Sequence, residues 1–276
     1  DHTDVVKVLL QHDADMSKKN HENKRALDIV AEKCNMELVN SFLAKNPNQN
    51  ILVDALHYVV KTNSKNTKIQ AEVVKALCEK MHEDINSITF QFNTPLMIAA
   101  SNGNLDVVNT LLQLGADPYI SPLRSSDTAL SIAVKGKHRN IAKTILDNKR
   151  LDDPNNINEP AQSILKSSDA YEIRKALSIA VENNTQDLIE MLCAELKRDQ
   201  PSLNIALVDA AITGNEKFVK ILLEAGAKVD QANNDGLTPL MFASIKGHEK
   251  VVEILLEAGA NDLHKALVAA VKNNHK

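Results

Sequence analysis

The sequence predicts an all-α fold, a solenoid of stacked helix-turn-helix repeats, from three observations. Stretches that begin at Thr94 and Thr238 match at 12 of 24 positions without a gap, so one unit recurs along the chain. Each copy carries two apolar patterns with helical i, i+3, i+4 spacing. Aromatic residues are only 3% of the 276 residues and Trp is absent, so the core is small and aliphatic. Such side chains suit closely stacked helices better than a barrel or a sandwich.

The clearest copy defines both helices of the unit. Thr94 and Pro95 have the arrangement of a helix N-cap followed by a first-turn proline, so the first helix begins there. Gly103 supplies the permissive backbone that ends it. Its buried face consists of Leu96, Ala99 and Ala100. A second helix follows after a short turn, and Gly115 closes it. Its buried side consists of Val107, Val108, Leu111 and Leu112.

Alignment of the copies fixes the repeat count and the insertions. The first-helix leucines are Leu27, Leu56, Leu96, Leu130, Leu177, Leu207, Leu240 and Leu267. We expect about seven complete or degenerate repeats in a single domain over residues 1–276, with each end of the chain inside a repeat. Unequal intervals predict insertions near residues 62–70 and 150–174. The second insertion is either a contact feature or a tolerated surface loop.

The repeat units resemble ankyrin repeats. The resemblance rests on TPL at the head of the first helix, VV and LL in the second helix, and GAD after it, as in Thr94 to Asp117. It covers almost the whole chain and implies an ankyrin-type helical solenoid, in which finger hairpins link one repeat to the next. Intervals shorter than a full repeat predict short or missing fingers in some repeats. The family also implies a concave binding face made by first helices and fingers.

Charge and composition argue against several classes of partner. The net charge of −4 is spread along the chain, and no basic stripe of the kind that binds nucleic acid is present in the sequence. No apolar run is long enough to span a membrane. Three scattered cysteines predict free thiols in a reducing, cytoplasmic compartment. The abundance of Asn and Lys resembles ankyrin proteins of intracellular bacteria, some of which act in the host cytoplasm.

The standard catalytic and ligand motifs do not occur in a convincing form. Gly136-Lys137-His138 lacks the spacing of a phosphate loop and falls in an inter-helix turn. His82-Glu83-Asp84 is the densest cluster of imidazole and carboxylate groups, and a solvated loop explains it. Cys34 occupies a turn position where other repeats have glycine. We therefore predict no enzyme activity, no catalytic or metal-binding residues and no cofactor.

Two groups of residues are predicted to contact a protein partner. Residues just after the small pair of each first helix should point into the concave face; they include Ser101, Lys135, Ile212, Ile245 and the neighbouring Lys246. The first patch is Phe90, Phe92 and Asn93, extended by Tyr119 from the next finger. The second patch is Ile212, Leu237 and Ile245. Exposed aromatic anchors are typical interface hot spots. Alternatively, the two phenylalanines pack on the repeat that precedes them.

These predictions favour a non-catalytic, monomeric scaffold that binds another protein of unknown identity through its concave face and finger loops. Two other readings stay open. The chain is the targeting or substrate-recruiting arm of a larger enzyme, with bacterial effectors as one such class, or it is an intramolecular spacer or autoinhibitory arm.

Overall fold

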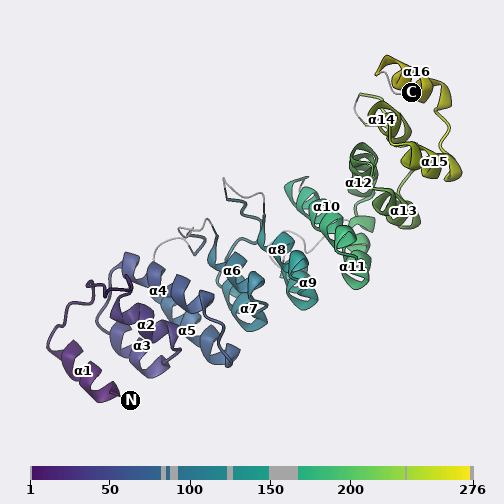
Figure 1. Ribbon diagram of the computed structural model, residues 1–276. Coiled ribbons are helices and arrows are strands. Elements are labelled where there is room, and N and C mark those ends of the chain that lie inside the picture. The colour runs from purple at the N-terminus through teal and green to yellow at the C-terminus, as the bar shows by residue number, and fades with distance from the viewer. Residues whose placement is uncertain are drawn as a thin grey trace, which may run out of the picture. The chain divides into compact units, whose positions relative to one another are not determined.

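The structure is a computed structural model that describes residues 2–81, 85–87, 93–122, 127–148, 167–233 and 235–273, with side chains omitted at 167–169. These residues form sixteen α-helices and no strand, which confirms the all-α class. The chain divides into two compact units, unit 1 (Asp1–Asp153) and unit 2 (Pro154–Lys276) (Figure 1). The expectation of one domain over the whole chain stays a prediction.

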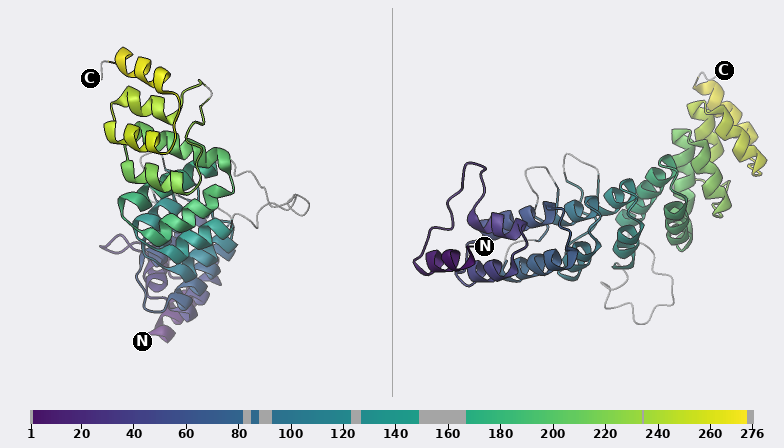
Figure 2. Two further views of the ribbon diagram at one scale, coloured as in Figure 1. Left: turned by 90° about the vertical axis from the view of Figure 1, so that its right-hand side faces the viewer. Right: turned by 60° about the horizontal axis from the view of Figure 1, so that its bottom comes forward.

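Unit 1 consists of two layers of helices, which Figure 2 shows from two further directions. First helices of successive repeats pack side by side in one layer: α2 (Ala26–Glu32), α4 (Gln49–Lys61), α6 (Pro95–Ser101) and α8 (Ala129–Lys135). Second helices form the other layer: α1 (Thr3–Gln11), α3 (Met36–Leu43), α5 (Thr67–Lys80), α7 (Leu105–Gln113) and α9 (Arg139–Asn148). Each first helix also packs on the second helix of its own repeat, which is the stacking that the sequence predicts.

Unit 2 repeats the same arrangement. Its first helices are α10 (Ser167–Glu182), α12 (Gln200–Thr213), α14 (Pro239–Lys246) and α16 (Leu263–Lys272), and each packs against the next. Its second helices are α11 (Gln186–Lys197), α13 (Glu216–Glu224) and α15 (Glu249–Glu257). First helices vary in length within each unit: α4 has 13 residues and α6 has 7 in unit 1, whereas α12 has 14 and α14 has 8 in unit 2.

The helix boundaries have the capping chemistry that the sequence predicts. The Thr94 hydroxyl accepts a hydrogen bond from the Met97 amide at 3.3 Å, and Pro95 is the first residue of α6. The second helix α7 begins after Asn104, whose side-chain oxygen accepts from the Val107 amide at 3.2 Å. These side chains satisfy amides that a helix N-terminus leaves without an intrahelical acceptor.

The core is made of the aligned leucines and the small residues around them. Leu96, Ala99 and Ala100 have no exposed surface, and the four apolar residues predicted for α7 are also buried. Leu267 is the exception, because its side chain is 64% exposed. The reason is that α16 packs on α14, and no second helix follows α16 among the described residues to cover that face.

The tight turns between the two helices of a repeat contain one residue with positive φ, whereas the longer turn between α4 and α5, which the structure describes in full, has none. Gly103 has φ +70° in the turn after α6, but in the next repeat the residue is Lys137, with φ +59°. Gly136, which precedes it, keeps a right-handed conformation with φ −76°. Cys34 takes the same turn position at φ 52°. The backbone geometry of the turn is therefore retained even where glycine is absent, at a cost in strain.

The insertion predicted near residues 62–70 lies between α4 and α5 and lengthens the turn and the start of α5. Residues 62–66 form the turn, and residues 67–70 are the first turn of α5. Gln70 is fully buried, and its amide nitrogen donates to the carbonyl oxygens of Val59 at 2.5 Å and Thr62 at 2.8 Å. Its oxygen accepts from the Asn104 side chain at 2.8 Å. Of residues 150–174, residues 167–174 belong to α10, and the rest lie outside the described part.

Connections between repeats vary in length as expected. Residues 44–48, 198–199 and 258–262 link neighbouring repeats directly, whereas residues 225–233 and 235–238 belong to a longer finger before α14. At its tip, the Asn233 amide donates to the Leu237 carbonyl at 3.0 Å, which closes the turn.

Candidate functional site

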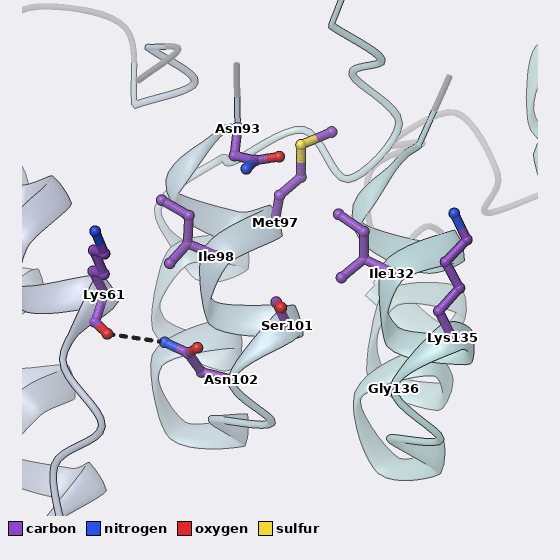
Figure 3. Close-up of a pocket in the computed structure, with 9 residues that line it drawn as sticks. All are labelled: Lys61, Asn93, Met97, Ile98, Ser101, Asn102, Ile132, Lys135 and Gly136. Carbon is purple, nitrogen blue, oxygen red and sulfur yellow. Dashed lines mark hydrogen bonds between the residues drawn. The ribbon is translucent and has the colours of Figure 1, made fainter. Parts of the chain in front are cut away.

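A hollow with a volume of about 540 Å³ lies on the first-helix layer of unit 1. We call it the unit 1 hollow, and Figure 3 shows its nine lining residues. They come from α4, α6 and α8 and from the turn residues beside them: Lys61, Asn93, Met97, Ile98, Ser101, Asn102, Ile132, Lys135 and Gly136. The hollow therefore extends over α6 and reaches both neighbouring first helices.

The floor of the hollow is aliphatic. Ile98 and Ile132 are half-buried and come from equivalent positions, two residues after the aligned leucines of α6 and α8. The i, i+3 spacing on a helix puts Ser101 on the same face as Ile98, and Lys135 on the same face as Ile132. Equivalent positions of two adjacent repeats thus line one continuous surface, which is how a repeat scaffold builds a binding face.

Two lysines flank this floor. Figure 3 shows Lys61 on one side of the two isoleucines and Lys135 on the other. The Lys135 ammonium lies 2.7 Å from a carboxylate oxygen of Asp127, whereas Lys61 forms no ion pair with a carboxylate in the described part of the chain. None of the nine described lining residues is acidic. The hollow therefore carries a local positive charge on a chain whose net charge is −4.

The frame of the hollow is fixed by a bond between repeats. The Asn102 side chain donates to the carbonyl oxygens of Val60 at 3.0 Å and Lys61 at 3.4 Å. These carbonyls belong to the last turn of α4 and have no acceptor role within that helix. The bond holds the end of α4, with Lys61, against the end of α6.

The unit 1 hollow brings together three of the predicted contact residues. Asn93, Ser101 and Lys135 all line it. Tyr119 is half-buried in the connection before α8 and is not among the lining residues; its amide donates to the Asp117 carboxylate at 2.8 Å. Phe90 and Phe92 lie outside the described residues, so their role stays a prediction.

Sequence reasoning missed the two isoleucines of the floor. A signal for them was present, because Ile98 and Ile132 both stand two residues after an aligned leucine. Apolar residues near a core leucine are usually assigned to the core, and only the structure shows that these two keep part of their surface exposed.

The predicted patch in unit 2 does not line the hollow found in that unit. Ile212, Leu237 and Ile245 are half-buried and Lys246 is exposed. A second hollow, of about 260 Å³, lies at the turns before α13 and α15, and none of these four residues lines it. The role of this patch in partner contact therefore stays a prediction.

The helices α10 and α12 of unit 2 each expose an apolar side chain that the sequence analysis did not select. Tyr171 of α10 is 53% exposed and Ile205 of α12 is 46% exposed. One turn further along these helices, Arg174 forms an ion pair with Asp209 at 3.5 Å. Burial raises the pKa of the Asp209 carboxyl, and the Arg174 guanidinium opposes that shift. The first-helix layer of unit 2 thus exposes one aromatic and one aliphatic side chain, and each lies one turn from a member of the ion pair between Arg174 and Asp209.

The cysteines have the properties of core thiols. Burial raises the pKa of Cys78 to about 12 and that of Cys193 to about 11, and burial also raises the pKa of Cys34. Thiols with raised pKa values carry little of the nucleophilic thiolate at neutral pH. All three are free of disulfides.

The remaining sequence candidates for chemistry give no site. The cluster at residues 82–84 lies outside the described part of the chain. Within the described ranges, no group of three His, Cys, Asp or Glu side chains is placed to hold a metal ion. Among the helices that the structure describes, none has the length and apolar character needed to cross a membrane.

Comparison with known proteins identifies the repeats. The family described as "Ankyrin repeats (3 copies)" matches residues 27–121, 90–158 and 177–265, which together are more than half of the chain. An ankyrin repeat and KH domain-containing protein of Caenorhabditis briggsae is 50% identical over 56 residues, which are 20% of this chain and 2% of that protein. The chain spans between 2% and 34% of the lengths of the curated relatives that it matches.

Two solved structures share the fold. The ankyrin repeat domain of Bcl-3, a member of the IkappaB protein family, aligns with a TM-score of 0.52 and 23% identity, over 75% of this chain and 86% of that domain. The human ASB11 ankyrin repeat domain aligns with a TM-score of 0.50 and 22% identity, over 86% of this chain and 99% of that domain. At this level of identity the likeness concerns the fold alone.

Proposed function

The chain belongs to the ankyrin repeat family, and from this premise we propose that it is a non-catalytic scaffold that binds a partner protein through the unit 1 hollow. Repeats of this family generally mediate protein–protein interaction. The observation that carries the proposal is the hollow itself, in which Asn93, Ser101 and Lys135 surround the half-exposed aliphatic floor of Ile98 and Ile132.

The physical basis of binding is a frame that is ordered before the partner arrives. The aligned leucines behind the floor, Leu96 and Leu130, have no exposed surface, so α6 and α8 are anchored in the core. Binding to such a frame loses little conformational entropy on the scaffold side. The floor supplies apolar area, and the Ser101 hydroxyl and the Asn93 amide supply hydrogen bonds at its edge.

The proposal extends to residues outside the hollow. Phe90, Phe92 and Tyr119 would add contacts from the fingers, and Ile212, Leu237, Ile245 and Lys246 would form a separate contact surface on unit 2. We further propose that the protein is monomeric and cytoplasmic, and that its partner is a protein rather than a nucleic acid. The mixed charge pattern of the chain supports the last point.

The experiment that tests the hollow compares two matched substitutions. Ile98→Asp puts a charge on the floor, whereas Ile205→Asp puts the same charge on an exposed isoleucine of unit 2. Affinity capture with the full chain, followed by quantitative mass spectrometry, measures partner recovery. We expect Ile98→Asp to abolish capture of specific partners and Ile205→Asp to retain it, with both variants keeping the far-ultraviolet circular dichroism spectrum of the folded protein. Equal recovery by both variants contradicts the role of the hollow.

A second candidate function is that of a targeting or substrate-recruiting arm within a larger enzyme, of which a bacterial effector in the host cytoplasm is one form. It is favoured by the small share of each curated relative that the chain matches, at most 34%. The sequence of the gene beyond these residues tests it directly. A catalytic motif outside residues 1–276 supports this function, and an open reading frame without one removes it.

A further inference from the structure

We propose that the unit 1 hollow selects an acidic, aliphatic partner segment: an extended stretch of protein with an aliphatic side chain between carboxylates. This inference rests on the proposed function and adds the chemistry of the partner. It follows from the charges around the hollow, from one internal ion pair, and from the order of the helices.

The charges of the lining residues have a single sign. Lys61 and Lys135 are the charged members of the set, and both side chains are exposed. They stand on opposite sides of the aliphatic floor (Figure 3). A basic partner segment would place like charges together here, which is unfavourable, whereas an acidic segment is complementary at both ends.

The ion pair between Lys135 and Asp127 shows the geometry that such a carboxylate adopts. Asp127 lies just before α8, its carboxylate is 2.7 Å from the Lys135 ammonium, and it also accepts from the Ser131 hydroxyl at 3.4 Å. A partner carboxylate therefore competes with Asp127 for Lys135. Lys61 has no such internal competitor among the described residues. We expect Lys61 to provide the larger share of the charge recognition.

The order of the helices sets the order of groups in the partner. Lys61 ends α4 and Lys135 ends α8, and α6 packs between these two helices. An extended segment that crosses α6 thus passes one lysine, then the floor of Ile98 and Ile132, then the other lysine. An aliphatic side chain flanked by acidic residues satisfies all three positions at once.

The test uses a displayed library of random dodecapeptides, selected on the purified full chain. Selected peptides are then synthesised with a fluorescent label and titrated by anisotropy against variants. The charge variants are Lys61→Gln and Lys135→Gln. The matched control is Lys197→Gln, which removes the exposed lysine that ends α11 in unit 2. Ile98→Asp identifies the peptides that bind the hollow.

We expect peptides that depend on Ile98 to be enriched in Asp and Glu beside Leu, Ile or Val. Removal of one exposed charge pair should weaken binding about three-fold, and the double lysine variant should weaken it about ten-fold. Lys197→Gln should leave the affinity unchanged. Asp127→Asn should tighten binding, because it frees Lys135, and added salt should weaken it.

The outcomes separate this inference from the proposed function. Neutral or basic peptides that depend on Ile98 but not on the lysines would overturn the acidic selectivity and leave the hollow as a binding site. If no selected peptide depends on Ile98, both proposals fail. Loss of binding in Lys197→Gln equal to that in Lys61→Gln would also overturn the inference, because the effect would then be one of net charge.

Discussion

The first-helix layers of the two units have the same backbone plan and different surfaces. In unit 1, the position two residues after the aligned leucine holds Ile98 in α6 and Ile132 in α8, and lysines flank them. In unit 2, the same position holds Ile179 in α10 and Phe242 in α14, but in α12 it holds Asp209, whose carboxylate pairs with Arg174. One scaffold position thus serves as an apolar contact in α6 and α8 and as half of an ion pair in α12.

This difference teaches that core and surface are specified independently in a repeat scaffold. Leu96 in unit 1 and Leu207 in unit 2 both have no exposed surface, so the stacking is the same. Surface positions close to them in sequence do not share that constraint. Each unit can therefore present its own chemistry on equivalent helices, and the comparison can be tested from the core outwards.

The largest expected effect concerns the shared core. Leu96→Ala and Leu207→Ala each remove a fully buried side chain, and each should lower the free energy of unfolding by about 2–5 kcal/mol. Urea denaturation followed by far-ultraviolet circular dichroism measures both. Tolerance of one substitution and not the other would show that the two units do not share one core plan.

A smaller loss is expected at the lengthened repeat of unit 1. Gln70→Leu removes the donor to the carbonyls of Val59 and Thr62 and the acceptor of Asn104. The substitution leaves these polar groups buried without that hydrogen-bond partner, so it should lower the free energy of unfolding by about 1–3 kcal/mol. The same denaturation measurement applies, with Gln186→Leu on the exposed start of α11 as the control. An equal effect of both substitutions would contradict the structural role of Gln70.

The inter-helix turns offer a pair of opposite substitutions. Gly214 of unit 2 has φ +73°, and an added Cβ would lie 2.6 Å from the His248 ring. Gly214→Ala should therefore destabilise the protein by about 1 kcal/mol or more. Cys34 of unit 1 holds the same turn at φ 52° without being glycine. Cys34→Gly should remove backbone strain worth about 1 kcal/mol. The greater conformational entropy of glycine in the unfolded chain offsets part of that gain. Melting temperatures that move in the same direction for both would contradict this account.

The smallest effect is a dependence of stability on pH. Asp28 of unit 1 has no exposed surface, and burial raises its pKa, while a hydrogen bond from the Arg25 amide and the Arg25 charge oppose the shift. The folded state binds this proton more tightly than the unfolded state does. The resulting stability is present below the unfolded pKa, roughly 3.9, and is lost as pH rises through the folded pKa.

Asp28→Asn should remove that part of the pH dependence, so its unfolding free energy should change less than that of the wild type from pH 4 upwards. Asp209→Asn should alter the dependence less, because the Asp209 side chain is 52% exposed. Parallel urea titrations at several pH values compare them. A pH profile of Asp28→Asn that is identical to the wild type would show that the carboxyl does not titrate with folding.

The sequence was sufficient to predict the helices, their caps and most of the core. Thr94 and Pro95 marked the start of α6, and the aligned leucines marked the buried row, because capping and burial depend on local pattern. Leu267 departs from the row, since burial also depends on whether a neighbouring helix is present.

The candidate site was only partly predictable. Ser101 and Lys135 follow from helical spacing, and both line the hollow. The floor residues Ile98 and Ile132 could not be separated from core residues by pattern alone, because half-burial is set by the distance between neighbouring repeats. The sequence also could not show that Lys137, and not Gly136, adopts the positive φ in the turn after α8. The position within the turn, and not the residue type, decides which residue adopts it.

The bond from Asn102 to the last carbonyls of α4 has a consequence for motion. Because one side chain joins the ends of two successive repeats, fraying of α4 must break a contact made by α6. Local opening of these repeats is therefore coupled, and a peptide held over α6 should slow amide hydrogen exchange in both helices, with protection extending beyond the residues that it contacts.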